Sequence, residues 1–359
     1  MTKDYELAVF IGRMQIPHVG HISVVRKALE IADHALIIIG SANTPRSHRN
    51  PFTVIERVKM LESSFTAEEL ARIRFAAVED VAYNDTAWIE SIQRVVAETA
   101  TKLNLVNPDI TLIGHSKDAS SYYLKLFPQW ASTNVENVTG LSSTPMRQAY
   151  FSNIGHLWLA DCDGHNVGDN AAQKLVTSGV KEFLEKFIKT EGYKYIVNEY
   201  EHITEYYRQW INSPYPPTFV TADALVEISG HILLVKRRAA PGKGLLALPG
   251  GFVNNNELIR DAVFRELREE TGIKVPEAVL RGSVVNKDVF DDPNRSSRGR
   301  TITHCYHVKL ANDVKLPRVK GGDDAETASW YPIHKIRRDQ MFEDHYDIIQ
   351  YFLGKAKTK

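Results

Sequence analysis

Short apolar runs alternate with longer amphipathic stretches over the first third of the chain. The apolar runs cover residues 7–11, 35–39, 73–78 and 110–113. The stretches with apolar residues at helical spacing are 20–32, 53–63 and 87–103. Short continuous apolar runs are typical of strands buried on both faces of a parallel sheet. Their alternation with helices predicts a doubly wound α/β domain, which binds nucleotides at the carboxyl ends of its strands.

The pattern changes after a proline-rich break at residues 213–217. Beyond it, residues 219–228 and 231–237 predict a hairpin across Ser229-Gly230, and 281–290 and 301–310 predict two more strands. Before it, residues 193–197 predict a strand and residues 199–211 an aromatic-rich helix. We therefore expect a first domain at 1–190, a linker at 191–217 and a second domain at 218–359.

The overall composition narrows the class of protein. The chain has 359 residues, 43% hydrophobic and 25% charged, which is typical of a globular protein of two domains. Its 44 basic and 44 acidic residues leave no basic excess for binding nucleic acid. Two cysteines exclude a disulfide framework. No apolar run approaches the ~20 residues of a membrane span, and the first residues do not resemble a signal peptide. We expect a cytoplasmic protein that binds neither nucleic acid nor membrane.

An unusual acidic helix follows Gly250-Gly251. Its apolar stripe consists of Ile259, Val263 and Leu267. At about 100° per residue, Glu266 and Glu270 fall inside this stripe and Glu269 lies beside it. Asn254 to Asn256 offer capping side chains for the helix start, and Gly272 offers a stop. Carboxylates that point toward a core need a cation, and oxygen ligands suit Mg²⁺ or Mn²⁺. The alternative is an ordinary Glu/Arg-rich surface helix.

This segment resembles the Nudix box, G-x5-E-x7-R-E-U-x-E-E-x-G-U, where U is a bulky aliphatic residue. The matching residues are Gly251, Glu257, Arg265, Glu266, Leu267, Glu269, Glu270, Gly272 and Ile273. The resemblance implies an α/β/α Nudix sandwich that hydrolyses a nucleoside diphosphate linked to another group. It implies that Glu266, Glu269 and Glu270 hold divalent metal and that Glu266 and Glu269 are catalytic. It further implies that Arg265 and Gly251 shape the binding site.

The loop after the first predicted strand is rich in groups that bind anions. It contains Gly12 and Arg13, followed by His18, Gly20 and His21. The two histidines are three residues apart at a helix start, so they lie on one side of its first turn. The helix N-terminus adds about half a positive charge. These features predict a triphosphate site. The alternative, a fragment of a zinc site, would need further ligands at matching spacing.

A second motif stands one domain length further on, at residues 141–147, Leu-Ser-Ser-Thr-Pro-Met-Arg. Its hydroxyls can hold phosphate oxygens, and its arginine can neutralise charge on a leaving pyrophosphate. Together with the histidine loop it resembles the nucleotidyltransferase superfamily, which implies a Rossmann-like domain that uses ATP. The residues that the resemblance assigns to catalysis are Arg13, His18, His21 and Arg147. Those that it assigns to nucleotide binding are Gly12, Gly20, Ser143 and Thr144.

Two local matches resemble the archaeal-type branch of nicotinamide mononucleotide adenylyltransferases. Residues 50–57 match N-P-F-T-x-x-E-R, and residues 83–88 match Y-N-D-x-x-W. The resemblance implies that Arg57 and Asn84 bind nucleotide and that Trp88 stacks on the nicotinamide ring. The alternative for Trp88 is a core aromatic. One departure is that Met14-Gln15-Ile16-Pro17 replaces the usual Phe-Gln-Pro.

The two resemblances cover residues 5–185 and 218–355, and the chain is similar to a family of bifunctional bacterial enzymes. They imply a multifunctional enzyme of NAD metabolism. The first domain would join ATP and nicotinamide mononucleotide into NAD and pyrophosphate. The second would hydrolyse ADP-ribose to AMP and ribose 5-phosphate. Both would use Mg²⁺ or Mn²⁺, the partners would be these small substrates, and we expect a homo-oligomer.

Two alternatives remain open from the sequence. The first domain could transfer nucleotides to another phosphorylated acceptor, such as phosphopantetheine or a polyol phosphate. The second could be a non-catalytic sensor of ADP-ribose. Such sensors usually lose box glutamates and carry a DNA-binding helix-turn-helix, and the sequence shows neither feature.

Overall fold

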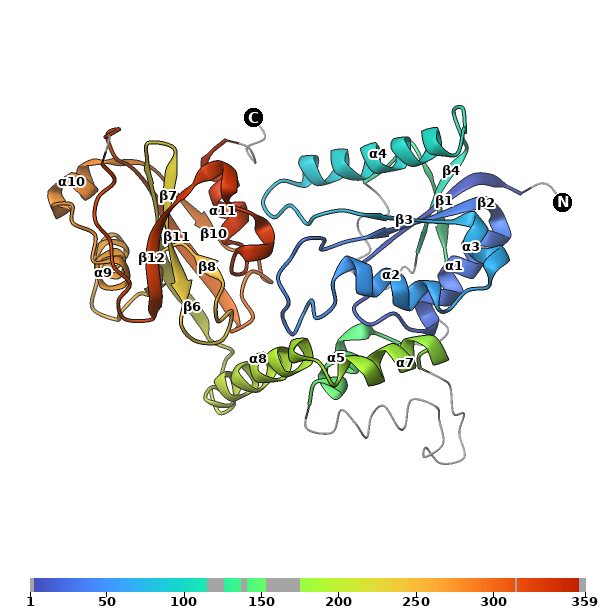
Figure 1. Ribbon diagram of the computed structural model, residues 1–359, viewed down its shortest axis with the longest axis horizontal. Coiled ribbons are helices and arrows are strands. Elements are labelled where there is room, and N and C mark those ends of the chain that lie inside the picture. Colours follow the sequence, from blue (N-terminus) through green and yellow to red (C-terminus); the bar gives the residue numbers. More distant parts are fainter. Residues whose placement is uncertain (1–2, 115–125, 137–140, 153–174, 314, 355–359) are drawn as a thin grey trace. The chain divides into compact units, whose positions relative to one another are not determined.

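The computed structural model describes residues 3–114, 126–136, 141–152, 175–313 and 315–354 (Figure 1). It divides into two compact units. The first contains residues 1–80 and 85–197, and the second contains residues 81–84 and 198–359. Within the described ranges, no helix combines the length and apolar character that a membrane span requires.

The first unit is built on a parallel sheet of order β3-β2-β1-β4-β5. Its strands are β1 (Tyr5–Gly12), β2 (Ala32–Ile39), β3 (Ile73–Ala77), β4 (Ile110–Gly114) and β5 (Ala131–Asn134). Alternate residues of β1 enter two different apolar clusters, with Ala8 and Phe10 on one face and Leu7 and Val9 on the other. Both faces are therefore buried, which explains why the strands read as continuous apolar runs.

Helices cover both faces of this sheet. The described helices of this unit before α8 are α1 (Val19–Ile31), α2 (Val54–Glu62), α3 (Ala67–Arg72), α4 (Asp85–Lys102), α5 (Ser143–Tyr150) and α7 (Ser178–Phe187). Val24 and Val25 of α1 pack on one face, and Ile92 and Val96 of α4 pack on the other (Figure 1). The predicted doubly wound fold is confirmed.

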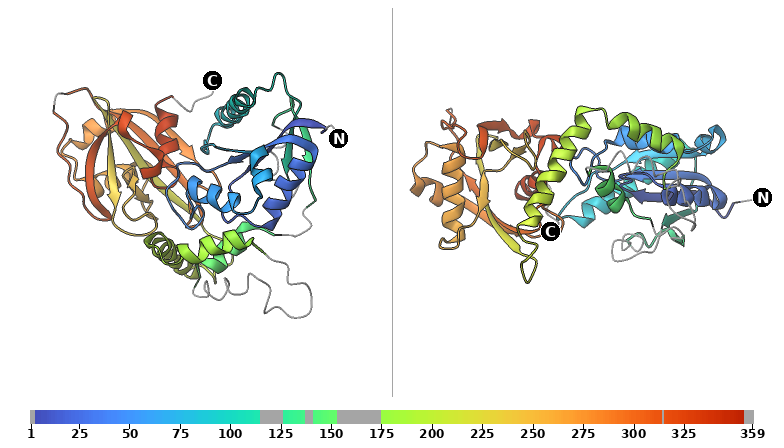
Figure 2. Two further views of the ribbon diagram at one scale, coloured as in Figure 1. Left: turned by 45° about the vertical axis from the view of Figure 1, so that its right-hand side comes forward. Right: turned by 90° about the horizontal axis from the view of Figure 1, so that it is seen from below.

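The helix α8 (Glu191–Arg208) follows, and Figure 2 shows it in yellow-green as one continuous helix. The prediction of a strand at 193–197 is wrong, because Ile196 and Ile203 bury one side of a helix there. The division between the two units falls inside α8, between residues 197 and 198.

The second unit is a sandwich of one mixed sheet between helices. The sheet order is β10-β11-β6-β7-β12, with β8 paired to β7 and β9 paired to β6. The strands are β6 (Thr218–Ile228), β7 (His231–Arg237), β8 (Leu246–Ala247), β9 (Gly250–Phe252), β10 (Val284–Phe290), β11 (Arg300–Lys309) and β12 (Ala325–Pro332). The predicted hairpin between β6 and β7 is confirmed, with Ser229 and Gly230 both at positive φ.

Two helices cover opposite faces of this sheet (Figure 1). Val263 and Leu267 of α9 (Ile259–Thr271) pack on one face, and Ile348 and Ile349 of α11 (His345–Phe352) pack on the other. The α/β/α sandwich is confirmed. The remaining elements are α10 (Glu277–Gly282), η2 (Ile333–Lys335) and η3 (Arg338–Gln340). The predicted strand at 281–290 is wrong at its start, because residues 281 and 282 end α10.

Candidate active sites

The loop between β1 and α1 brings both predicted histidines together. His18 is the residue before α1 and is buried. Its backbone N–H donates to Nδ1 of His21 over 3.2 Å, and the centroids of the two rings lie 3.8 Å apart. Gly20 is buried in the first helical turn between them. The two imidazoles therefore stand at the positive end of α1, at the carboxyl edge of the sheet.

The start of α5 joins this loop. Ser143 Oγ donates to the carbonyl of Ile16 over 3.0 Å. Arg147 is buried, and its guanidinium donates to the carbonyl of Gln15 and to Thr144 Oγ1. Arg147 and Gln15 are 132 residues apart in the chain. Their contact brings the two sequence motifs together into one site.

Positive charge accumulates at this site. Burial, followed by the neighbouring charges of Arg13 and Arg49, lowers the pKa of Arg147 to about 10. Burial, followed by the charges of Arg49 and Arg147, lowers the pKa of His48 to about 4. His48 is therefore neutral at pH 7. The positive charges of Arg13, Arg49 and Arg147 repel one another, and a bound anion relieves this repulsion. A polyphosphate has the charge that this site requires.

Arg57, predicted to bind nucleotide, makes contacts with the backbone in the structure. Its side chain is buried, and Nη1 donates to the carbonyls of Arg13 and Gly40, each over 2.7 Å. Further donations reach Ser41 and Thr53. These bonds hold the loops after β1 and β2 together. Gly12 ends β1, and a Cβ there would lie 3.2 Å from the Cε of Met14.

The predicted nicotinamide residues are separated by the division of the chain. Asn84 is buried and belongs to the second unit, whereas Trp88 lies in α4 of the first. The Trp88 ring is half-buried in the core and lies 6.1 Å from the ring of Phe127. This packing agrees with the alternative of a core aromatic, and contact with nicotinamide stays a prediction.

The second site begins where β9 approaches α9. The prediction that Asn254 to Asn256 cap the helix is wrong. The helix starts later, after Leu258, and the Asn254 N–H donates instead to Glu257 Oε1 over 2.8 Å. The predicted stop is confirmed, because Gly272 has a φ of 50°. Gly251 lies against Glu266 so closely that a Cβ would stand 2.7 Å from its carboxylate.

Arg265 holds three of the predicted carboxylates. Its guanidinium contacts Glu257 at 2.6 Å, Glu266 at 2.7 Å and Glu269 at 2.8 Å. It also donates to the carbonyl of Phe252 over 3.2 Å. One arginine therefore contacts three of the four box carboxylates, and its predicted role in shaping the binding site stays a prediction.

Glu270 stands apart from this arginine. It is buried, and its Oε2 accepts a hydrogen bond from the Gly250 N–H over 3.0 Å. Burial, together with the negative charges of Glu266 and Asp223, raises its pKa to about 8. Burial likewise raises the pKa of Glu266. Buried carboxylates that repel one another are the donor set that a divalent cation neutralises.

The residues present fit a divalent metal, although they are not assembled as a finished site. Among the described residues, no group of three or more His, Cys, Asp or Glu side chains is gathered closely enough to hold a metal ion. The Arg265 guanidinium occupies the space between Glu266 and Glu269 instead. Their oxygen atoms, with those of Glu270, supply the hard ligands that Mg²⁺ or Mn²⁺ prefers.

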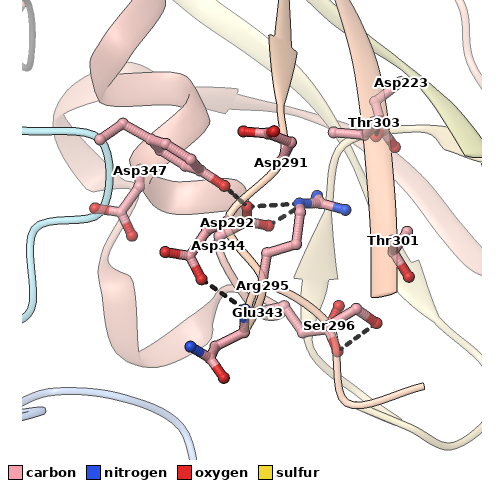
Figure 3. A network of polar contacts seen from close by, with 12 residues as sticks. Asp223, Asp291, Asp292, Arg295, Ser296, Thr301, Thr303, Glu343, Asp344 and Asp347 are labelled. Carbon is pink, nitrogen blue, oxygen red and sulfur yellow. Dashed lines mark hydrogen bonds and ion pairs between the residues drawn. The ribbon is translucent and has the colours of Figure 1, made fainter. Parts of the chain in front are cut away.

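The sequence analysis did not predict three buried charged residues of the second unit, Asp223, Arg295 and Asp344. Asp223 of β6 accepts a hydrogen bond from Thr303, and Arg295 contacts Asp344 through two bonds of 2.9 Å (Figure 3). Tyr83, in the short segment that groups with the second unit, also donates to Asp344. A lone aspartate inside the apolar run of β6 was a usable signal for Asp223.

Comparisons with known proteins match each unit separately. Residues 9–148 match the model of the Cytidylyltransferase-like family, and residues 217–352 match that of the NUDIX domain. A nicotinamide/nicotinic acid mononucleotide adenylyltransferase of Acinetobacter baylyi is 36% identical over 197 residues, which are 55% of this chain and 94% of that protein. An ADP-ribose pyrophosphatase of Methanocaldococcus jannaschii is 35% identical over 134 residues, which are 37% of this chain and 72% of that protein.

A solved structure matches over nearly the whole chain. It is a bifunctional NMN adenylyltransferase/ADP ribose pyrophosphatase of Francisella tularensis, crystallised with AMP and a manganese ion. It is 34% identical, with a TM-score of 0.85 over 98% of this chain and 100% of that chain. Both units of this chain therefore occur in the same order in one known protein.

Proposed function

This chain belongs to the family of bifunctional NMN adenylyltransferases/ADP-ribose pyrophosphatases, and we propose how its residues divide the two reactions. The first unit is the adenylyltransferase, and residues of β1, α1 and α5 carry it. The second unit is the ADP-ribose pyrophosphatase, and residues of β9 and α9 carry it. We further propose residues 1–190 and 218–359 as the two domains, Mg²⁺ as the working metal, a homo-oligomer and a cytoplasmic location.

The observation that carries the first assignment is Arg147, which bonds to both the β1–α1 loop and Thr144. An oxygen of the nicotinamide mononucleotide phosphate attacks the α-phosphorus of ATP, and the bond to pyrophosphate breaks. The attacking oxygen is already ionised, so no general base is required. His18, His21, Arg13 and Arg147 hold and neutralise the polyphosphate, with Ser143 and Thr144 at the helix start. Catalysis here is positioning plus electrostatic stabilisation.

The observation that carries the second assignment is the contact of Arg265 with three box carboxylates. Water attacks one phosphorus of ADP-ribose, the diphosphate bond breaks, and AMP and ribose 5-phosphate leave. Glu266, Glu269 and Glu270 would hold the divalent metal, which activates water and neutralises phosphate charge when bound. Arg265 fixes two of these carboxylates. Gly251, which has no side chain, leaves room for the Glu266 carboxylate beside the β9 backbone.

A paired assay tests both assignments on the same preparation. NAD formation is measured with ATP, nicotinamide mononucleotide and Mg²⁺, and AMP release is measured with ADP-ribose and Mg²⁺. We expect His18→Ala to lower NAD formation about 100-fold or more and to spare hydrolysis. Glu269→Gln should do the reverse.

Glu185→Gln, on the exposed side of α7, is the matched control and should leave both rates unchanged. Absence of NAD formation by the unaltered chain would refute the first assignment. Hydrolysis that survives in Glu269→Gln would refute the proposed metal ligands.

A further inference from the structure

The helix α8 carries a buried carboxylate inside its apolar stripe. Glu199 lies between Ile196 and Ile203 at helical spacing, so the three side chains share one side of the helix. All three are buried, and Glu199 is only 3% exposed. A carboxylate that loses its hydration in this way needs a specific hydrogen-bond partner.

The partner of Glu199 is the backbone of the loop between β7 and β8. Both carboxylate oxygens accept from the Gly242 N–H, each over 3.0 Å. Gly242 has a φ of 76°, and a Cβ there would collide with the Phe342 ring. Only glycine fits this position without strain. The loop is therefore fixed from two directions, by the Glu199 carboxylate and by the Phe342 ring.

The same peptide group also binds Arg237. The carbonyl of Pro241 belongs to the peptide bond that carries the Gly242 N–H, and it accepts from Arg237 Nε over 2.9 Å. The guanidinium also stacks on Phe342, with its central carbon 4.1 Å from the ring centroid. One peptide group thus joins two opposite charges, with the Glu199 carboxylate at its N–H and the Arg237 guanidinium at its carbonyl. Hydrogen bonds in such a chain polarise and strengthen one another.

Arg237 extends this chain of contacts to the hydrolase site. Burial lowers the pKa of Arg237, and so does the charge of Arg298. The negative charges of Glu343, Glu270 and Asp324 raise it. The guanidinium therefore lies within electrostatic reach of Glu270, a box carboxylate. A positive charge at this place attracts an anionic diphosphate, and a planar guanidinium acts best when its orientation is held.

We propose that Glu199 is a positioning residue of the hydrolase, which fixes the Arg237 guanidinium near the box carboxylates through the Pro241–Gly242 peptide group. The helix α8 then contributes to the second active site and is more than a connection in the chain. Glu199 lies outside residues 217–352, which match the NUDIX domain model. It acts through Arg237 and does not itself touch the substrate. This inference rests on the proposed pyrophosphatase function of the second unit.

Steady-state kinetics of ADP-ribose hydrolysis by the full chain test the role of Glu199. We expect Glu199→Ala to raise KM about 10-fold, the size of losing one hydrogen bond to a charged group, with kcat within about threefold. Glu199→Gln should keep KM within about threefold, because its amide oxygen still accepts from the Gly242 N–H. Glu199→Asp withdraws the carboxylate by one methylene and should raise KM as alanine does. It keeps the test decisive if the alanine variant does not fold.

A double-mutant cycle distinguishes positioning from a purely structural role. Arg237→Met removes the guanidinium and keeps an apolar stem over Phe342, and it should raise KM at least as much as Glu199→Ala. Adding Glu199→Ala to Arg237→Met should then raise KM by less than about twofold, because the effect of Glu199 passes through Arg237. Two losses that multiply in the double variant would overturn the proposal.

Glu201→Ala is the matched control, because it removes an exposed glutamate from the same helix and should leave KM unchanged. NAD formation by the first unit is the internal reference for each variant. If the unaltered chain does not hydrolyse ADP-ribose, the proposed function itself fails. If it does so and Glu199→Ala and Glu199→Asp keep its KM, the role of Glu199 is refuted and the pyrophosphatase assignment stands. A Glu199→Gln variant as impaired as Glu199→Ala would also overturn the proposal.

Discussion

Replacing Gly251 by alanine should separate folding from catalysis in the hydrolase. The new Cβ would stand 2.7 Å from the Cδ, Oε1 and Oε2 atoms of Glu266, whereas ordinary contact begins near 3.4 Å. The carboxylate must therefore withdraw by about 0.7 Å. It is the far end of a flexible side chain, so we expect the free energy of unfolding to fall by no more than about 1.5 kcal/mol.

The catalytic cost of the same shift should be much larger. Glu266 would leave its 2.7 Å contact with Arg265, which also orients Glu269. A displacement of about 1 Å in a reacting geometry costs about 100-fold in rate, which corresponds to about 2.7 kcal/mol in the barrier. We therefore expect Gly251→Ala to lower kcat for ADP-ribose hydrolysis about 100-fold.

The chain contains its own reference for this experiment, because NAD formation by the first unit should not change. Gly282→Ala is a matched control, since a Cβ at Gly282 meets no atom within 4 Å. Hydrolysis by Gly251→Ala within threefold of the unaltered rate would refute the reasoning. An equal loss of both activities would refute it too, because the predicted damage is confined to one carboxylate.

Three further predictions concern buried charges. Burial lowers the pKa of His345 to about 4. Below pH 6.5 the unfolded state therefore binds more protons than the folded state. As the pH falls from 6.5 to 4, the free energy of unfolding should decrease by up to about 3 kcal/mol. In urea unfolding, His345→Gln should reduce this fall, and an unchanged pH slope would contradict the assignment. Arg338→Met leaves Asp347 buried without its bidentate partner at 2.7 and 2.8 Å and should cost about 3–5 kcal/mol. Adding Asp347→Leu should recover most of that loss, and a double variant no more stable than the single one would argue against it. EDTA should stop ADP-ribose hydrolysis. The affinity for Mn²⁺, measured by calorimetry, should rise with pH up to about 8, because Glu270 must lose its proton to bind the metal. An affinity that does not depend on pH would exclude Glu270 as a ligand.

The elements with strong periodicity were predictable from the sequence. The four apolar runs became β1 to β4, and the helix at 53–63 starts at its capping residue Thr53, whose side chain accepts from the Glu56 N–H. These segments carry local signals that agree with their burial. β5 was missed because its residues are polar and mostly exposed, so only pairing with β4 makes it a strand.

The wrong predictions arose where tertiary contacts override local preference. Asn254 to Asn256 have good capping side chains, yet the Asn254 N–H bonds to Glu257, which Arg265 holds in place. The helix start is therefore displaced to Leu258. Residues 193–197 contain β-favouring side chains, but Ile196 is buried on one side of α8 with Ile203, two helical turns away.

The box residues of the hydrolase were predictable because their spacing is local, within one loop and one helix. Arg295 and Asp344 were not predictable as a pair, because 49 residues separate them and neither has a local reason to be buried. For Arg57, in contrast, the sequence motif suggested a different role from the one that its contacts in the structure support. Its motif suggested nucleotide binding, while its hydrogen bonds to the carbonyls of Arg13, Gly40 and Ser41 show a support for the loops.

The two sites differ in the sign of the charge that the protein leaves unbalanced, and that sign indicates the ligand. In the first unit, the charges that shift the pKa of Arg147 are both cationic, from Arg13 and Arg49. In the second, Glu266 and Asp223 raise the pKa of Glu270. Burying like charges together is unfavourable in the free protein. It becomes favourable when an anionic polyphosphate enters the first site and a divalent cation enters the second. Filling either site with a group of the opposite sign should therefore stabilise its own unit against unfolding.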